Sequence, residues 1–175
     1  MRVLVANASR HGSTREIADA IAAELRAAGF DVDVREVGGV VDVDPYDVVV
    51  LGSAVYAGRW LPEAHRFAER HRAKLAAVPL WLFSSGPLGS DGPEPDGDPH
   101  RVADLVRAYG ARGHRIFPGK LDRSALGLGE RLVATMVGAP EGDFRDWGAI
   151  RGWARSIAGS LRAEGVRAGA RTAAR

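Results

Sequence analysis

The fold of this chain is decided by one stretch, Asn7-Ala8-Ser9-Arg10-His11-Gly12-Ser13-Thr14-Arg15-Glu16, which joins an apolar run to a helical pattern. The apolar run, Val3–Ala6, is typical of a buried strand, and residues 14–28 repeat apolar side chains at helical spacing. A chain that passes from strand to helix through small hydroxyl residues and one glycine presents unpaired backbone N–H groups at the positive end of the helix dipole. We therefore expect this loop to bind an anion, as a phosphate-binding loop does.

Residues that are missing from the loop narrow the choice of anion. A Walker loop needs two spaced glycines followed by Lys-Ser or Lys-Thr, and a dinucleotide-binding loop needs three spaced glycines. This loop has no lysine and only Gly12, so ATP and NAD are both disfavoured. The hydroxyls of Ser9, Ser13 and Thr14 suit a terminal phosphate monoester, as in a mononucleotide such as FMN. The alternative is that Ser13 is only the N-cap of the helix and Glu16 its capping-box partner.

The composition bounds the class of protein. The chain has 175 residues, 46% of them hydrophobic, which suits one domain with its own core. It contains no cysteine, which excludes disulfides, thiolate zinc sites, iron–sulfur clusters and cysteine nucleophiles. No apolar run reaches the roughly 18 residues of a membrane span, and the N-terminus follows a strand pattern rather than that of a cleavable leader. We expect a cytoplasmic protein.

Five apolar runs alternate with helical patterns along the chain. The predicted strands are 3–6, 32–37, 48–52, 80–84 and 114–117, and the predicted helices are 14–28, 62–77, 98–111 and 146–163. This alternation predicts an α/β fold in which helices cover both faces of a parallel sheet. We expect one domain over residues 1–163 and a basic, flexible C-terminal tail over residues 164–175. The tail has no interleaved aromatic residues and no binding motif, so we expect no nucleic-acid binding.

Two segments exceed the usual loop length of such folds, and loops of this length are usually functional. Residues 85–99 are rich in glycine, proline and acidic side chains, which offers a docking surface for a basic reductase. Residues 119–145 contain a Leu/Val/Met pattern that predicts an extra short helix. That helix is either packed on the domain or an amphipathic segment that contacts a membrane surface peripherally.

Three loops are expected to meet at one edge of the sheet. If the first, third and fourth strands are neighbours, the loops that follow them, Ala8–Thr14, Ser53–Leu61 and Ser84–Ser90, lie at their carboxyl ends, where open parallel sheets bind ligands. Tyr56 and Trp60 in the second loop offer aromatic faces for stacking on a planar heterocycle. Alternatively, these two residues cap the sheet edge or pack on the following helix.

The chain resembles the flavodoxin superfamily, and within it the flavodoxin-like proteins related to menaquinone-dependent protoporphyrinogen dehydrogenase. The resemblance spans nearly all of residues 1–160 and rests on three segments: Ala8-Ser9-Arg10-His11-Gly12-Ser13-Thr14, Gly52-Ser53-Ala54-Val55-Tyr56-Ala57-Gly58 and Pro140-Glu141-Gly142-Asp143-Phe144-Arg145-Asp146-Trp147. It implies a three-layer sandwich with a five-stranded parallel sheet of order 2-1-3-4-5 and FMN as cofactor. The cofactor-binding residues that it implies are Ser9, Arg10, His11, Gly12, Ser13 and Thr14 around the phosphate, and Ser53, Ala54, Val55, Tyr56, Ala57, Gly58, Ser84, Ser85, Gly86, Pro87, Leu88 and Gly89 around the isoalloxazine ring.

The chain also departs from ordinary flavodoxins. Arg10 and His11 stand where those proteins have uncharged residues, and the net charge of this chain is +2, whereas ordinary flavodoxins are acidic. These departures favour an FMN-dependent oxidoreductase, with porphyrinogen oxidation and a quinone acceptor as the reaction that the resemblance permits. The alternatives are an electron carrier that docks protein redox partners, and a binding module that has lost its cofactor. FMN carries the redox chemistry, so no residue is assigned a catalytic role.

Two other chemistries are disfavoured. A hydrolase of the common α/β type would need a Gly-x-Ser-x-Gly turn, and the sequence has none. His65 and His71 lie six positions apart on one predicted helix, so they point in different directions and cannot share a metal ion. No metal site is expected.

Overall fold

The computed structural model describes residues 1–56, 58–86, 102–121 and 141–173. Its strands are β1 (Arg2–Ala8), β2 (Asp31–Glu36), β3 (Val48–Tyr56), β4 (Arg59–Trp60), β5 (Leu80–Ser85), β6 (Gly113–Phe117), β7 (Lys120–Leu121) and β8 (Gly142–Asp143). Its helices are α1 (Ser13–Ala27), the short 3-10 helix η1 (Val37–Gly39), α2 (Pro62–Arg70), α3 (Arg72–Ala77), α4 (Val102–Tyr109) and α6 (Trp147–Ala173).

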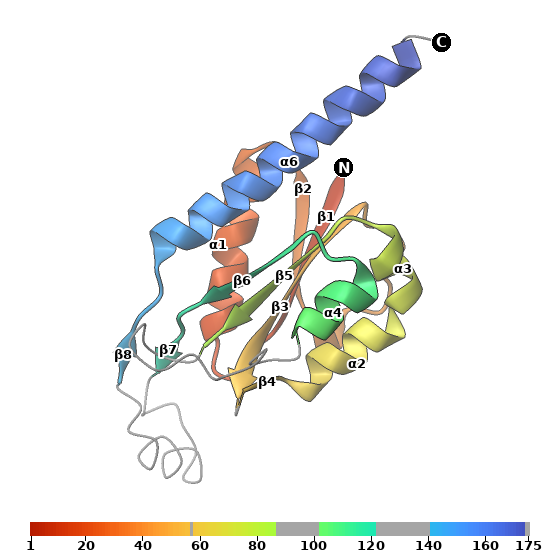
Figure 1. Cartoon of the computed structure of the whole chain (residues 1–175). Helices are drawn as coiled ribbons and strands as arrows, with labels where there is room; N and C mark the ends of the chain where they lie inside the picture. The colour runs from red at the N-terminus through yellow and green to blue at the C-terminus, as the bar shows by residue number, and fades with distance from the viewer. Residues whose placement is uncertain (57, 87–101, 122–140, 174–175) are drawn as a thin grey trace.

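The main sheet has parallel strands in the order β2-β1-β3-β5-β6. Counted along the chain, the five parallel strands have the predicted order 2-1-3-4-5, which confirms the α/β flavodoxin-like fold. Helices α1 and α6 lie on one face of the sheet, and α2, α3 and α4 lie on the other (Figure 1). The strand register pairs Ala8 with Ser53 and Ser53 with Ser84. The chain therefore leaves β1, β3 and β5 at the same edge of the sheet, as expected.

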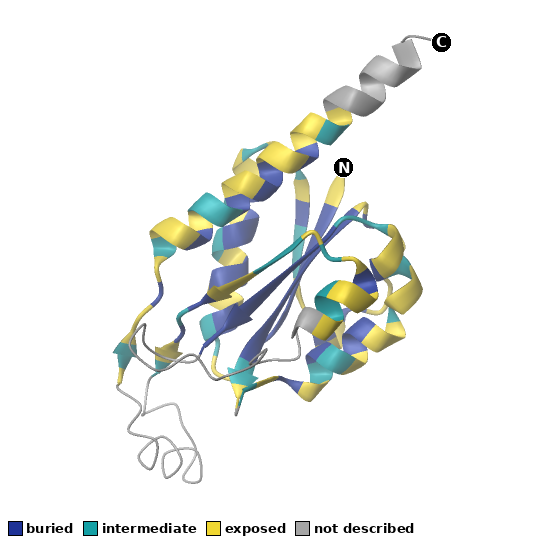
Figure 2. Cartoon of the chain, viewed as in Figure 1, coloured by how far each residue is buried: buried dark blue, intermediate teal, exposed yellow. Residues whose placement is uncertain are grey.

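The sheet separates two apolar cores, so its central strands are buried on both sides (Figure 2). β1 and β3 are nearly continuous apolar runs because every side chain of a strand covered on both faces enters a core. Gly52 in β3 is required by packing. A Cβ atom added there would lie against Cζ, Cε1 and Cε2 of Phe83, well under the 3.0 Å that real Cβ contacts keep.

Three element boundaries differ from the sequence-based prediction. β3 continues to Tyr56, because β4 pairs antiparallel with its last residues and prolongs the ladder. The predicted helix 62–77 is divided at His71, whose ring packs against Phe67 with 4.8 Å between centroids, into α2 and α3. The last helix does not end at Ala163 but continues to Ala173, because its alanine- and arginine-rich sequence favours helix despite Gly165. The predicted extra helix of segment 119–145 lies outside the described residues.

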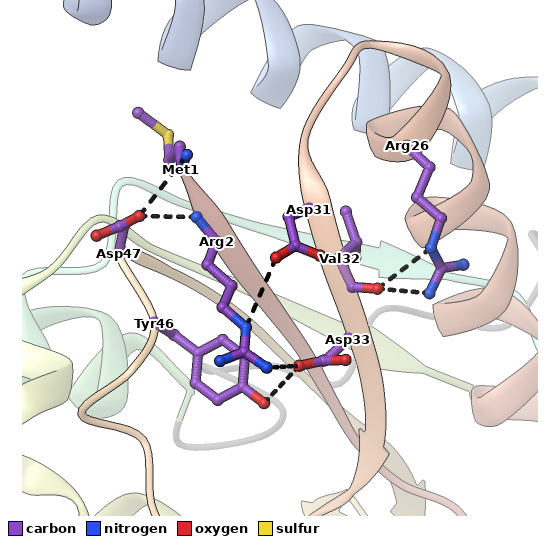
Figure 3. Close-up of polar contacts among 8 residues, drawn as sticks. All are labelled: Met1, Arg2, Arg26, Asp31, Val32, Asp33, Tyr46 and Asp47. Atoms are coloured by element: carbon purple, nitrogen blue, oxygen red, sulfur yellow. Dashed lines mark hydrogen bonds and ion pairs between the residues drawn. The ribbon is translucent and has the colours of Figure 1, made fainter.

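The amino ends of the strands are joined by a polar cluster (Figure 3). The carboxylate of Asp33 accepts hydrogen bonds from the Tyr46 hydroxyl at 2.9 Å and from the Arg2 guanidinium at 2.8 Å. Asp47 accepts one from the Arg2 backbone N–H at 2.7 Å. The hydrogen bond from Tyr46 lowers the pKa of Asp33 despite the opposing effect of burial, and burial together with Asp33 raises the pKa of Tyr46. The cluster ties β1, β2 and the segment before β3 together.

Candidate functional site

The first turn of α1 has no side-chain cap. Its N-cap residue is Gly12, with φ of 85° and ψ of −19°, a left-handed conformation that favours glycine. The capping-box alternative is wrong, because the Ser13 hydroxyl accepts a hydrogen bond from the Lys120 backbone N–H at 3.2 Å and the Glu16 carboxylate accepts one from Arg145 at 2.7 Å. The backbone N–H groups at this helix start are therefore available to an anion.

The rest of the phosphate loop (residues 9–14) is arranged around this helix start. Thr14 is buried, Ser9, Gly12 and Ser13 are partly buried, and Arg10 and His11 are exposed. A Cβ atom added to Gly12 would meet no described atom within 4 Å. Among the described residues, none therefore packs against the Cα of Gly12, and the loop carries the exposed side chains of Arg10 and His11.

Tyr56 at the end of β3 lies beside the phosphate loop. The Tyr56 residue is 37% exposed to solvent, although its aromatic ring is large and mainly apolar. The guanidinium carbon of Arg10 lies 4.9 Å from the centroid of the Tyr56 ring, and the His11 ring centroid lies 6.4 Å from it. The structure thus brings together three residues that the sequence assigned to two different loops.

Trp60 does not reach the exposed edge. It is 2% exposed, and its indole N–H donates a hydrogen bond to the Ser84 hydroxyl at 2.8 Å. For Trp60 the packing alternative is therefore correct, and its ring is not available for stacking on a ligand. Tyr56 is exposed at the end of β3, and its stacking on a ligand stays a prediction.

Two of the serines predicted to bind the cofactor, Ser53 and Ser84, have structural partners instead. The Ser53 hydroxyl is buried, donates to the Ala54 carbonyl at 2.8 Å and accepts from the Leu61 N–H at 3.0 Å. The Ser84 hydroxyl is buried between Trp60 and the Nε2 atom of His114, which lies 2.9 Å away. Both hydroxyls hold β3, β4 and β5 together beneath the site. No sequence signal pointed to His114, which reads as an ordinary strand residue.

Of the other residues predicted to bind the cofactor, five belong to the described part of the chain and four do not. Ala54 and Ser85 are buried, Val55 and Gly58 are partly buried, and the N–H of Gly86 donates to the Phe117 carbonyl at 2.9 Å. Gly86 has φ of 101°, so the chain turns sharply where it leaves β5. Ala57, Pro87, Leu88 and Gly89 lie outside the described residues.

Arg145 lies beside the site, and the sequence analysis assigned it no role. Its side chain is 3% exposed and binds both carboxylate oxygens of Asp143, with Nε–Oδ1 at 2.8 Å and Nη2–Oδ2 at 2.6 Å. A third bond joins it to Glu16 in the first turn of α1, and its guanidinium carbon lies 4.5 Å from the centroid of the Trp147 ring. These hydrogen bonds raise the pKa of Arg145, and Arg145 lowers the pKa of Asp143.

A family model described as a flavodoxin domain matches residues 4–147. The chain belongs to this flavodoxin-domain family. Solved flavodoxins share the fold: one from the domain Archaea matches with a TM-score of 0.61 at 18% identity, over 93% of this chain and 99% of its own. The flavodoxin of Megasphaera elsdenii matches with a TM-score of 0.54 at 27% identity, over 65% of this chain and 84% of its own.

A curated relative of this flavodoxin domain is the protoporphyrinogen IX dehydrogenase [quinone] of Escherichia coli strain K12. The two are 31% identical over 86 residues, which is 48% of each chain. The match thus spans about half the length of that relative. Within the described residues, no helix has both the length and the apolar character needed to cross a bilayer.

The cofactor of a flavodoxin domain is FMN, and the site fits it. A phosphate monoester needs hydrogen-bond donors and no competing cap. The helix start after Gly12 provides both, since its backbone N–H groups have no side-chain cap. An aromatic face for the ring system is present at Tyr56, beside the phosphate loop. The residues described here are therefore compatible with FMN at the carboxyl edge of the sheet.

Proposed function

We propose that this flavodoxin domain is an FMN-dependent dehydrogenase that oxidises a porphyrinogen and passes the electrons to a quinone. Its support is the 31% identity to protoporphyrinogen IX dehydrogenase [quinone] over 86 residues. The basic character of the chain, with a net charge of +2, favours a small anionic substrate over a basic protein partner. We also propose that the protein works in the cytoplasm.

In this proposal the chain's own residues bind and orient. The backbone N–H groups of the first turn of α1, with the hydroxyls of Ser9 and Thr14, hold the phosphate, and Tyr56 borders the ring. FMN supplies the redox chemistry by accepting the electrons of the substrate. The protein fixes where the substrate approaches and excludes water from the ring.

The exposed cations beside Tyr56 support an anionic substrate. Arg10 lies over the Tyr56 ring, and Arg59, which pairs with Tyr56 in the β3–β4 ladder, is exposed as well. A porphyrinogen is a large macrocycle that bears carboxylate side chains. Guanidinium groups pair well with carboxylates, so Arg10 and Arg59 are the residues we propose to orient it.

The test begins with FMN binding and continues with turnover. The purified protein is titrated with FMN, and the loaded protein is then assayed anaerobically for the fluorescent porphyrin formed from protoporphyrinogen with menadione as acceptor. We expect turnover that falls in R10Q and R59Q through a higher KM. An FMN-loaded protein that forms no porphyrin above the rate of free FMN would contradict the dehydrogenase proposal.

An electron carrier is the second candidate, and one comparison favours it. The Megasphaera elsdenii protein, 27% identical, is a flavodoxin whose two-electron reduced form has been solved. A carrier would exchange electrons with a reductase at a rate that depends on ionic strength, and it would not need a small substrate. Reduction of the bound FMN by a flavodoxin reductase, without porphyrinogen turnover, would favour the carrier.

A further inference from the structure

Arg145 lies at the junction between the phosphate loop and the late part of the chain. Two backbone contacts place it there: Lys120 N–H donates to Ser13, and Phe144 N–H donates to the Gly119 carbonyl at 3.1 Å. The short ribbon formed by β7 and β8, in which Lys120 pairs with Asp143, is thereby attached to the start of α1. Arg145 is the buried cation of this junction, with its side chain 3% exposed.

Glu16 is unfavourable to a phosphate at the same helix start. An acidic residue in the first turn of a helix interacts with the same partial positive charge that attracts an anionic ligand. Glu16 is 54% exposed, and its carboxylate is bound by Nη1 of Arg145 at 2.7 Å. The ion pair therefore offsets negative charge that a phosphate would otherwise meet in this turn.

We propose that Arg145 is a positioning residue for the cofactor phosphate, acting by neutralising Glu16 rather than by touching the ligand. The proposal rests on the proposed FMN site. The charges at the junction balance: Glu16 and Asp143 are negative, and Arg145 and Lys120 are positive. Loss of Arg145 leaves this group with one uncompensated negative charge next to a dianionic ligand.

A double-mutant cycle that changes the charges of Arg145 and Glu16 distinguishes this role from a purely structural one. In R145M the junction has an excess negative charge, in E16Q an excess positive charge, and in R145M/E16Q it is balanced again. At low ionic strength we expect R145M to bind FMN about tenfold more weakly, E16Q to bind it more tightly, and the double variant to return to within about threefold of the wild type. Riboflavin, which lacks the phosphate, should change by less than about threefold in all three variants.

A matched control is available on the same helix α1. Arg155 of α6 pairs with Glu24 of α1 at 3.5 Å, far along the helix from the phosphate loop. R155M removes an arginine–glutamate pair made by the same helix α1 and should leave FMN affinity unchanged. The readout is the quenching of flavin fluorescence on titration, at 20 mM and at 500 mM salt.

The outcomes distinguish the alternatives. Rescue by E16Q, together with a loss in R145M that shrinks at high salt, supports the proposal. A double variant as weak as R145M, or equal losses for FMN and riboflavin, would overturn it and leave Arg145 as a purely structural residue. If R145M does not fold, R145Q takes its place in the same cycle, with the same supporting and contradicting results. A wild-type protein that binds no FMN at all would instead contradict the proposed function.

Discussion

Replacing Gly52 by alanine should destabilise the domain far more than one added methyl group suggests. A Cβ atom at this position would lie well under 3.0 Å from three atoms of the Phe83 ring. Carbon atoms in contact keep about 3.5 Å or more, so the ring must retreat by roughly 1 Å or more. Phe83 is fully buried, and its ring has the rings of Phe117 and Trp153 at 6.3 and 6.2 Å between centroids. The ring therefore has little room to move.

The magnitude follows from the cost of overpacking a core. Extra methylenes in a packed core cost about 1–3 kcal/mol, and this site is at the upper end because aromatic neighbours enclose the ring, so we expect about 3 kcal/mol for G52A. Urea denaturation followed by far-UV circular dichroism measures the free energy of unfolding. For a domain whose total stability is about 5–15 kcal/mol, such a loss is readily visible.

Gly113 provides the control. It also lies in a strand of the same sheet, but a Cβ atom there would lie 3.5 Å from Trp81 Cδ1, which is an ordinary contact. G113A should therefore be neutral or stabilising by about 0.5 kcal/mol, since alanine loses less backbone entropy on folding. In the double variant G52A/F83L, the smaller side chain should recover part of the loss, with a coupling above about 1 kcal/mol. Equal effects of G52A and G113A would refute the reasoning.

Three further predictions concern stability and pH. W60F removes one of the two hydrogen-bond partners of the buried Ser84 hydroxyl and should cost about 1–3 kcal/mol in urea denaturation. FMN titration should show little change, because Trp60 does not reach the exposed edge. The pKa of Asp33 is lowered in the fold, so this carboxylate stabilises the protein above its unfolded-state pKa near 3.8, and the stabilisation is lost as the pH falls below that value. D33N should therefore flatten the acid limb of a plot of unfolding free energy against pH. An unchanged limb would argue against the Tyr46 hydrogen bond. Burial lowers the pKa of His71, so stability should fall as the pH drops below 6.5, where the unfolded chain takes up the proton more readily, and H71Q should abolish that part of the dependence.

The fold was predictable because its signals are local. Each parallel strand is a short apolar run, and α1 repeats apolar residues every three to four positions, so element type and sheet class follow from neighbours in the sequence. The boundaries were less predictable where tertiary pairing decides them. β3 extends to Tyr56 only because β4 returns to pair with it.

The site was predictable in position but not in detail. The phosphate loop and Tyr56 were named from the sequence and lie together. Ser13 was predicted to bind the phosphate, with a helix cap as the alternative, and neither prediction included the hydrogen bond that its hydroxyl accepts from the backbone of Lys120, 107 residues away. Arg145 and Glu16 are separated by 129 positions. Contacts of such range leave no periodic pattern, so inspection of one sequence does not identify them.

The two ends of the parallel strands differ in function, and this difference affects how the sequence can evolve. The amino ends carry the Arg2, Asp33 and Tyr46 cluster, whereas the carboxyl ends carry the phosphate loop and Tyr56. The whole apolar core lies between them. Mutational drift at Arg10 or His11, which are exposed, can alter what the protein recognises while the strand pairing at the opposite edge persists. Diversification of ligand choice and preservation of the scaffold can therefore proceed at independent rates.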